Sequence, residues 1–419
     1  MRKYVIPITT RYASVLVQFA VVAVVTHALS RGDAGRYFVV MGLVLATYFV
    51  AGFGLPDGVV RFAPALAATD LVAQADSLLR RGFRFSIATV PIGAVAGGVI
   101  VALYVGFNYS ALLAALWWAS YGTIFVSAQM VVAAGKSELG TAMFYSAANT
   151  GQLVLTVPSI VLGRLDDLAT VLAATVAGTS VAAAVCLVIA VRNCGPSSGV
   201  GQPLGAAWRQ GAVIATGRVI QSCFLWSPVW VVGIVLGPSD AALVGLASRL
   251  VSAVAAVLAA VRFSIRPRLA RDAAQGNWQA IQRHSSQIAL FTTGLAVFAM
   301  LVSATVGDEL ITLVFGSDYR GAALIVTLML IGTLGESFGG PVDEVLKMAG
   351  HARAVVGVQI VVMTAGFGLQ ILAARAAGVT GLVTVYGLMF VIMYLALIGY
   401  LWKLQRILIV PRLIRDISP

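Results

Sequence analysis

Long apolar runs alternate with short polar gaps along nearly the whole chain. A helix that spans a membrane needs about 20 predominantly apolar residues, and about 12 segments of this chain meet that length. The pattern therefore predicts an all-α polytopic membrane protein. The expected spans cover residues 6–29, 37–60, 83–105, 110–133, 141–162, 168–191, 210–236, 241–265, 285–306, 322–345, 354–374 and 380–401.

Two short sequence patterns recur about 200 residues apart and in the same order. Residues 29–34 read LSRGDA and residues 236–241 read LGPSDA, while residues 60–67 read VRFAPALA and residues 261–270 read VRFSIRPRLA. Internal repeats are typical of transporters with a central site and alternating access. We therefore predict two six-helix bundles that are related by internal pseudo-symmetry.

The longest gap between predicted spans divides these bundles. Residues 192–209 are rich in Gly, Pro and Ser, which indicates a flexible linker. The expected organisation is an N-terminal bundle over residues 1–191, a cytoplasmic linker over 192–209, and a C-terminal bundle over 210–419 that ends in a basic cytoplasmic tail. Two amphipathic stretches, residues 68–81 and 271–284, are expected to form short separate helices at the lipid headgroups.

Composition excludes a soluble globular protein. Hydrophobic residues make up 60% of the chain and charged residues 11%, whereas soluble domains carry about 25% charged residues. The net charge is +12, but most Lys and Arg residues lie in gaps on one side of the predicted membrane. This positive-inside pattern predicts a multi-pass protein with both termini in the cytoplasm. The basic side chains are expected to contact anionic membrane lipids, and no nucleic acid is expected as a partner.

Three arginines lie inside predicted spans, where burial of a charge costs roughly 3 kcal/mol or more. Arg11, Arg218 and Arg249 suggest a cationic cavity for an anionic substrate, because the forked guanidinium matches phosphate oxygens. Arg11 lies near the start of its span, so snorkelling to the headgroups explains it about equally well. Near the end of the second span, Asp57 and Arg61 are four residues apart and can pair on one helix face. A structural salt bridge is the preferred interpretation of Asp57, with ion coupling as the alternative.

Acidic residues gather in the tenth predicted span, where residues 339–341 read GGP and break the helix. A broken helix at membrane depth is tolerated where it lines a water-filled cavity. Glu336 and Asp343 are therefore candidates to bind a coupling proton or sodium ion. A structural ion pair explains Glu336 equally well.

Several classes of chemistry have no signal in the sequence. There is no Walker-type GxxxxGK[ST] motif, no His/Cys cluster with metal-ligand spacing and no nucleophile elbow. The three cysteines are interpreted as small packing residues. No enzymatic activity, catalytic residue, metal or cofactor is expected beyond a proton or sodium gradient.

With these residues in view, the chain resembles the oligosaccharide (O-antigen, Wzx-type) flippases of the multidrug/oligosaccharidyl-lipid/polysaccharide exporter (MOP) superfamily. The resemblance is distributed and rests on these segments: residues 29–37 (LSRGDAGRY), 52–61 (GFGLPDGVVR), 236–249 (LGPSDAALVGLASR), 266–270 (RPRLA), 313–322 (LVFGSDYRGA) and 340–350 (GPVDEVLKMAG). It implies a bacterial inner-membrane protein with a flippase/MATE-like fold.

The resemblance also implies a function and a set of partners. The implied substrate is a polyprenyl-diphosphate-linked oligosaccharide, which would be flipped for the synthesis of a surface polysaccharide such as lipopolysaccharide or exopolysaccharide. A polysaccharide polymerase and glycosyltransferases are the implied partners. Related lipid flippases use cavity arginines on helices 1, 2 and 8, to which Arg11, Arg61 and Arg249 correspond here.

The sequence disfavours two alternative families and leaves a third open. The major facilitator superfamily also has two six-helix halves, but its signature between helices 2 and 3 is missing. An O-antigen polymerase needs a long external loop, and the predicted external loops are short. A cation-coupled multidrug or small-molecule antiporter of the same superfamily is the nearest alternative, and it would favour an acidic site.

Overall fold

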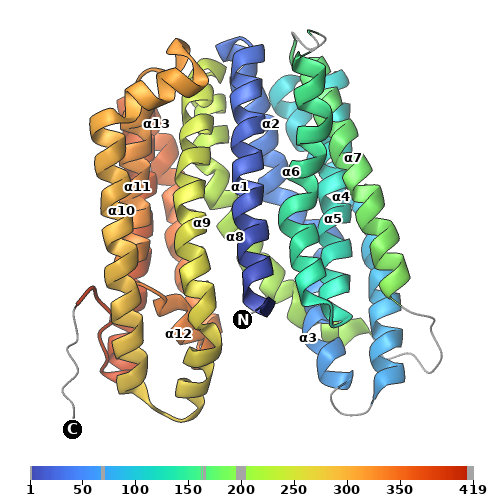
Figure 1. Ribbon diagram of the computed structural model, residues 1–419, viewed down its shortest axis with the longest axis vertical. Helices are drawn as coiled ribbons and strands as arrows, with labels where there is room; N and C mark the ends of the chain where they lie inside the picture. Colours follow the sequence, from blue (N-terminus) through green and yellow to red (C-terminus); the bar gives the residue numbers. More distant parts are fainter. Residues whose placement is uncertain (1, 68–70, 162, 164–166, 195–203, 413–419) are drawn as a thin grey trace. The chain divides into compact units, whose positions relative to one another are not determined.

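A computed structural model describes the chain except for residues 1, 68–70, 162, 164–166, 195–203 and 413–419. In the described residues all regular elements are helices (Figure 1). The α-helices are α1 (Arg2–Ala28), α2 (Arg31–Thr47), α3 (Leu55–Ala67), α4 (Val72–Val105), α5 (Tyr109–Ala133), α6 (Ser137–Val161), α7 (Leu168–Asn193), α8 (Leu204–Val235), α9 (Pro238–Ala274), α10 (Trp278–Phe315), α11 (Ala322–Phe338), α12 (Val342–Met348) and α13 (Ala352–Gln405), and the 3₁₀-helices are η1 (Tyr48–Gly54) and η2 (Ser317–Tyr319).

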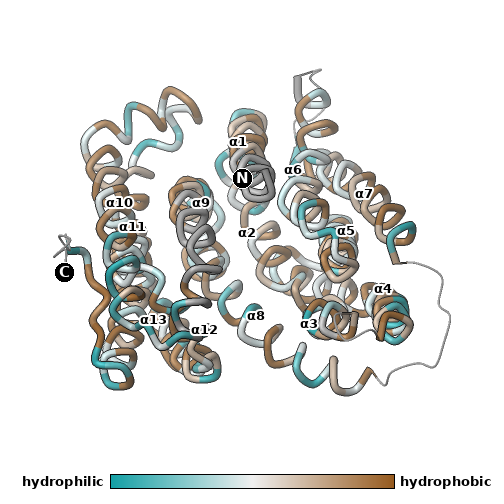
Figure 2. The backbone as a smooth tube through the Cα atoms, turned by 60° about the horizontal axis from the view of Figure 1, so that its bottom comes forward, coloured by the Kyte–Doolittle hydropathy of each residue, from teal (hydrophilic) through white to brown (hydrophobic). Residues whose placement is uncertain are grey.

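The predicted all-α polytopic membrane fold is confirmed. Among the described residues, eight helices are long and apolar enough to cross a membrane, and hydrophobic colour runs along helices such as α4 and α7 in Figure 2. The last two predicted spans share α13, which is interrupted at Ala377 and Gly378. The tenth span is divided as the GGP motif predicts, because α11 ends at Phe338 and α12 begins at Val342.

The prediction of two separate surface helices is wrong. Residues 72–81 form the first turns of α4, which continues without a break to Val105. The second stretch is divided between the end of α9 and the start of α10, which begins after Asn277 caps it through the backbone N–H of Ala280. The polar residues extend spanning helices because α4 contains nothing in this stretch that stops helical hydrogen bonding.

The chain forms two compact units, Met1–Trp230 and Val231–Pro419. The boundary lies within α8, and part of the predicted linker lies outside the described residues. The assignment of bundles to residues 1–191 and 210–419 stays a prediction.

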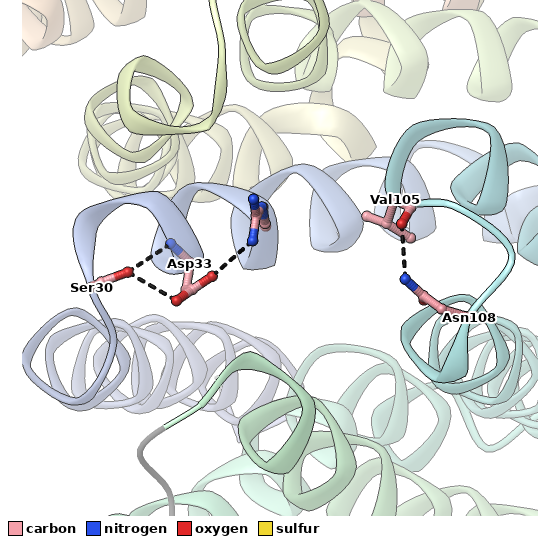
Figure 3. A network of polar contacts seen from close by, with 5 residues as sticks. Ser30, Asp33, Val105 and Asn108 are labelled. Atoms are coloured by element: carbon pink, nitrogen blue, oxygen red, sulfur yellow. Dashed lines mark hydrogen bonds and ion pairs between the residues drawn. The ribbon is translucent and has the colours of Figure 1, made fainter.

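In the first unit, α5 packs against α4 and α7, and α6 packs against α7 and α1. Its core contains the large buried side chains of Tyr37, Phe38, Trp117, Trp118 and Phe125. Figure 3 shows polar contacts at helix ends of this unit, with Ser30 beside Asp33 at the start of α2 and the side chain of Asn108 donating to the carbonyl oxygen of Val105 at the end of α4. Ser30 accepts the backbone N–H of Asp33 at 3.2 Å and starts α2, and Asn108 starts α5 by accepting the N–H of Ser110 at 3.0 Å.

In the second unit, α11 packs against α13, α10 and α9, and α12 packs against α13 and α9. Gly332 and Gly387 allow α11 and α13 to approach closely, since a Cβ added to Gly387 would lie 2.9 Å from the carbonyl oxygen of Leu328. The two units therefore each contain their own packed helical core.

Candidate functional site

A break in the second predicted span builds the charged site of the first unit. Within η1 the backbone leaves the helix at Ala51, and Gly52, Phe53 and Gly54 take positive φ angles of 77°, 49° and 81°. Glycine adopts this left-handed region at little steric cost. The helix starts again at Leu55, so Asp57 lies in the first turn of α3, where a negative charge is favoured by the helix dipole.

Asp57 forms an ion pair with Arg218 of α8. The Arg218 Nη1 lies 2.8 Å from the Asp57 Oδ1, and the side chains are 31% and 4% exposed respectively. The expected pairing of Asp57 with Arg61 is therefore replaced by a contact with a helix distant in sequence. Arg61 is exposed on α3. The structure thus brings together Asp57 and Arg218, two predicted site residues that were assigned to different roles.

Two aromatic rings enclose the guanidinium of Arg218. Its Cζ lies 5.4 Å from the centroid of the Phe49 ring and 5.5 Å from that of Phe125. Such distances allow cation–π attraction, which is stronger where the cation is partly desolvated. These two rings could not be identified from the sequence, because an aromatic residue in an apolar span gives no signal that distinguishes it from ordinary packing.

The second unit holds Arg249 on α9, and the side chain is 4% exposed. Burial of a guanidinium to this degree requires compensating interactions, so the position is explained poorly by snorkelling. Arg11 lies on α1, and its side chain falls outside the described part of the chain. The expectation that Arg11, Arg218 and Arg249 bind one anionic substrate stays a prediction.

Glu336 lies on α11 and is half-buried. The hydroxyl of Tyr394, on α13, donates a hydrogen bond to the Glu336 Oε1 at 3.2 Å. The sequence did not indicate this partner, because the two residues come from different spans. A half-buried carboxylate on a strongly apolar helix can exchange a hydrogen bond for a bound cation.

Asp343 has a more local environment on α12. The Lys347 Nζ lies 2.8 Å from the Asp343 Oδ2 and 3.8 Å from the Glu344 Oε1. Because Lys347 lies one helical turn after Asp343, this pair stabilises the short helix. The arrangement favours a structural role for Asp343 and makes Glu336 the better candidate for ion coupling.

Comparison with known proteins identifies the architecture. A MatE family model matches residues 213–372, which include Arg218, Arg249 and Glu336. No curated protein matches the chain.

Several solved structures are similar over nearly the whole chain. The MATE multidrug transporter DinF-BH has a TM-score of 0.65 at 11% identity, covering 96% of this chain and 94% of its own. A mutant of the Vibrio cholerae MATE transporter VcmN has a TM-score of 0.63 at 15% identity, with 96% and 95% covered. The lipid II flippase MurJ in an inward closed conformation has a TM-score of 0.59 at 10% identity, with 94% and 86% covered.

These likenesses confirm the predicted MATE-like fold. The narrower resemblance to O-antigen flippases is not supported by these matches and stays a prediction.

Proposed function

We propose that this protein is a secondary transporter of the MOP superfamily that works by alternating access in the bacterial inner membrane. The observation that carries the proposal is the MATE-like fold over 96% of the chain, together with the MatE match at residues 213–372. A proton or sodium gradient supplies the energy, with Glu336 as the residue that binds the coupling ion.

Two substrate classes fit such a transporter. The first is a polyprenyl-diphosphate-linked oligosaccharide, and the arginines inside the helices, Arg218 and Arg249, favour it because a guanidinium matches phosphate oxygens in a forked geometry. The similar fold of a lipid II flippase supports this class as well. Glycosyltransferases that make the substrate and a polymerase that consumes it are the proposed partners.

The second class is a small cationic or amphiphilic molecule, exchanged for a cation as in a multidrug antiporter. Glu336 favours this class, since a half-buried carboxylate suits a cation. The structural likeness to multidrug transporters supports it at least as well as the first. In addition, Arg218 is already paired with Asp57, which reduces the cationic character attributed to the arginines.

Substitutions of Arg249 distinguish the two substrate classes. Replacement by Lys keeps the positive charge but loses the forked hydrogen bonding of the guanidinium, and replacement by Ala loses both. If the substrate is a lipid-linked glycan, flipping in proteoliposomes falls in the order parent, Arg249→Lys, Arg249→Ala, while export of cationic dyes changes little. Equal flipping by parent and Arg249→Ala, at equal protein level, would exclude the first class and favour the antiporter.

Glu336→Gln tests the coupling. The amide keeps the size and can still accept a hydrogen bond from Tyr394, but it loses the negative charge. Transport driven by an imposed proton or sodium gradient should be abolished, while the amount of membrane-inserted protein stays the same. Gradient-driven transport at the parental rate would return Glu336 to a structural role.

A further inference from the structure

The Asp57–Arg218 pair uses only part of what each group offers. One nitrogen contacts one oxygen, and the second carboxylate oxygen, Oδ2, is buried and accepts no hydrogen bond from any described residue. A guanidinium has five N–H donors in a fork that fits two oxygens of one ligand. A single contact is therefore weaker than the forked contacts that a phosphate group could make.

Exposure makes the pair asymmetric. The Asp57 side chain is enclosed at 4% exposure, whereas Arg218 keeps 31% of its side chain exposed. The Arg218 side chain is therefore open to the approach of a ligand while the carboxylate is not, although the Nη1 that contacts Asp57 is itself buried. Phe49 and Phe125 hold the guanidinium from two sides, and this attraction does not depend on which anion Arg218 contacts.

The Asp57–Arg218 pair also links α8 to α3, next to the break in the second predicted span. Gly211 of α8 and Gly54 lie so close that a Cβ on Gly211 would come within 2.0 Å of the Gly54 carbonyl oxygen. The indole Nε1 of Trp208 donates to the carbonyl oxygen of Phe53 at 3.1 Å. Asp57 and Arg218 add the charged link to this contact, so a change of partner on Arg218 is transmitted to the docking of α8.

We propose that Asp57 is an internal counter-ion that occupies Arg218 until a phosphate group of the substrate displaces it, and that this exchange loosens α8 from the second span. The inference rests on the proposed transport of a diphosphate-linked substrate. When a phosphate group takes the place of Asp57 on Arg218, the buried Asp57 carboxylate loses its partner, and the free-energy cost of this loss opposes the exchange. A multiply charged phosphate group overcomes this opposition, and a monovalent anion such as chloride does not.

Cys223 provides a native reporter of the contact. It is half-buried on α8, and its Sγ lies 3.7 Å from the carbonyl oxygen of Ala46. With Cys186 and Cys194 replaced by Ala, alkylation of Cys223 in the purified full-length protein measures how firmly α8 is docked. Inorganic pyrophosphate and farnesyl diphosphate are the probes, and chloride at equal ionic strength is the control.

We expect slow alkylation without ligand and an increase of about tenfold with a diphosphate, the factor that corresponds to one charge-assisted hydrogen bond. Acceleration by both probes identifies the phosphate group itself as the displacing ligand, and acceleration by farnesyl diphosphate alone identifies a lipid-linked phosphate. Asp57→Asn should be alkylated rapidly without ligand and respond little to either probe. The matched control Asp33→Asn removes a carboxylate from the exposed Asp33–Arg36 pair of the same unit and should behave as the parent.

The charge-swapped variant Asp57→Arg/Arg218→Asp keeps the ion pair that docks α8 but removes the arginine at position 218 that the diphosphate would bind. Slow alkylation of Cys223 in this variant, with no response to diphosphates, supports the exchange. If neither probe accelerates alkylation of the parent, the exchange is wrong even where glycan transport is observed. If the probes accelerate alkylation but the glycan is not transported, the exchange stands and the first substrate class fails.

Discussion

An ionisable side chain in an apolar helix is retained only where another group meets its charge, and three pairs in this protein show different solutions. Asp57 and Arg218 pair across two helices, Asp343 and Lys347 pair within one helical turn, and Glu336 receives a neutral hydroxyl. We propose ion coupling at Glu336 before the other two acids, because both of those acids contact a cationic side chain.

Replacement of Tyr394 by Phe tests this assignment directly. The ring and its packing remain, but the hydrogen bond to the Glu336 Oε1 is lost, so a coupling cation no longer competes with a hydroxyl. A hydrogen bond of this kind contributes about 1–2 kcal/mol. The cation concentration that gives half-maximal transport should fall several-fold in Tyr394→Phe.

Tyr400→Phe is the matched control, because Tyr400 lies on the same helix and its ring faces His351. Its cation dependence should equal that of the parent. An unchanged cation dependence in Tyr394→Phe would mean that the coupling ion does not bind at the Glu336 Oε1.

Only part of this site could be predicted from the sequence. Most candidate acids and arginines were found because a charge in an apolar span is conspicuous, whereas Arg61 was named from the resemblance and from its spacing to Asp57. Spacing also suggested Arg61 as the partner of Asp57, which is wrong, because partners on other helices are decided by tertiary packing. The contacts of Phe49 and Phe125 with the Arg218 guanidinium are also decided by tertiary packing, so the sequence gives no signal for them.

Among the helices, the contact of α3 with α8 is set by small residues. A Cβ added to Gly58 would lie 1.9 Å from the carbonyl oxygen of Ala207. No side chain fits there unless the two helices separate. The break at η1 and this close approach together determine where Asp57 meets Arg218.

Gly58→Ala should therefore weaken the first unit, although Ala is the better helix former. Forced separation of packed helices costs about 1–3 kcal/mol, and the apparent melting temperature in detergent should fall. Gly205→Ala is the matched control on α8, since nothing lies within 4 Å of the added Cβ. A Gly58→Ala protein as stable as Gly205→Ala would contradict the close packing of α3 and α8.

The sequence predicted the helical elements well because their signals are local. Apolar runs predicted the spans and the GGP motif predicted the break after Phe338, whereas the break after Ala51, inside the second predicted span, was not predicted. The two separate surface helices were wrong because hydropathy reports where a helix leaves the membrane, not where it ends. Helix α4 continues through its polar turns.

For the molecule as a whole, the structural comparisons show the fold and do not decide a substrate. Multidrug transporters and a lipid II flippase are all similar to this chain at 10–15% identity. A common fold serves different substrates when the side chains inside it differ. We propose that the side chains of Arg249, Arg218 and Glu336, rather than the architecture, decide the substrate.

Orientation in the membrane is a property of the entire chain that helix α5 can report. Its 25 residues span about 37 Å, more than the roughly 30 Å hydrocarbon core, so its two ends emerge on opposite sides. Phe107 and Ser137 flank α5 and are exposed.

In a chain whose native cysteines are replaced, Phe107→Cys should react with an impermeant thiol reagent added outside cells, and Ser137→Cys should react only after permeabilisation. This outcome follows from the excess of Lys and Arg on the Ser137 side. The reverse labelling would invert the proposed topology, and labelling of both from outside would mean that α5 does not cross the membrane.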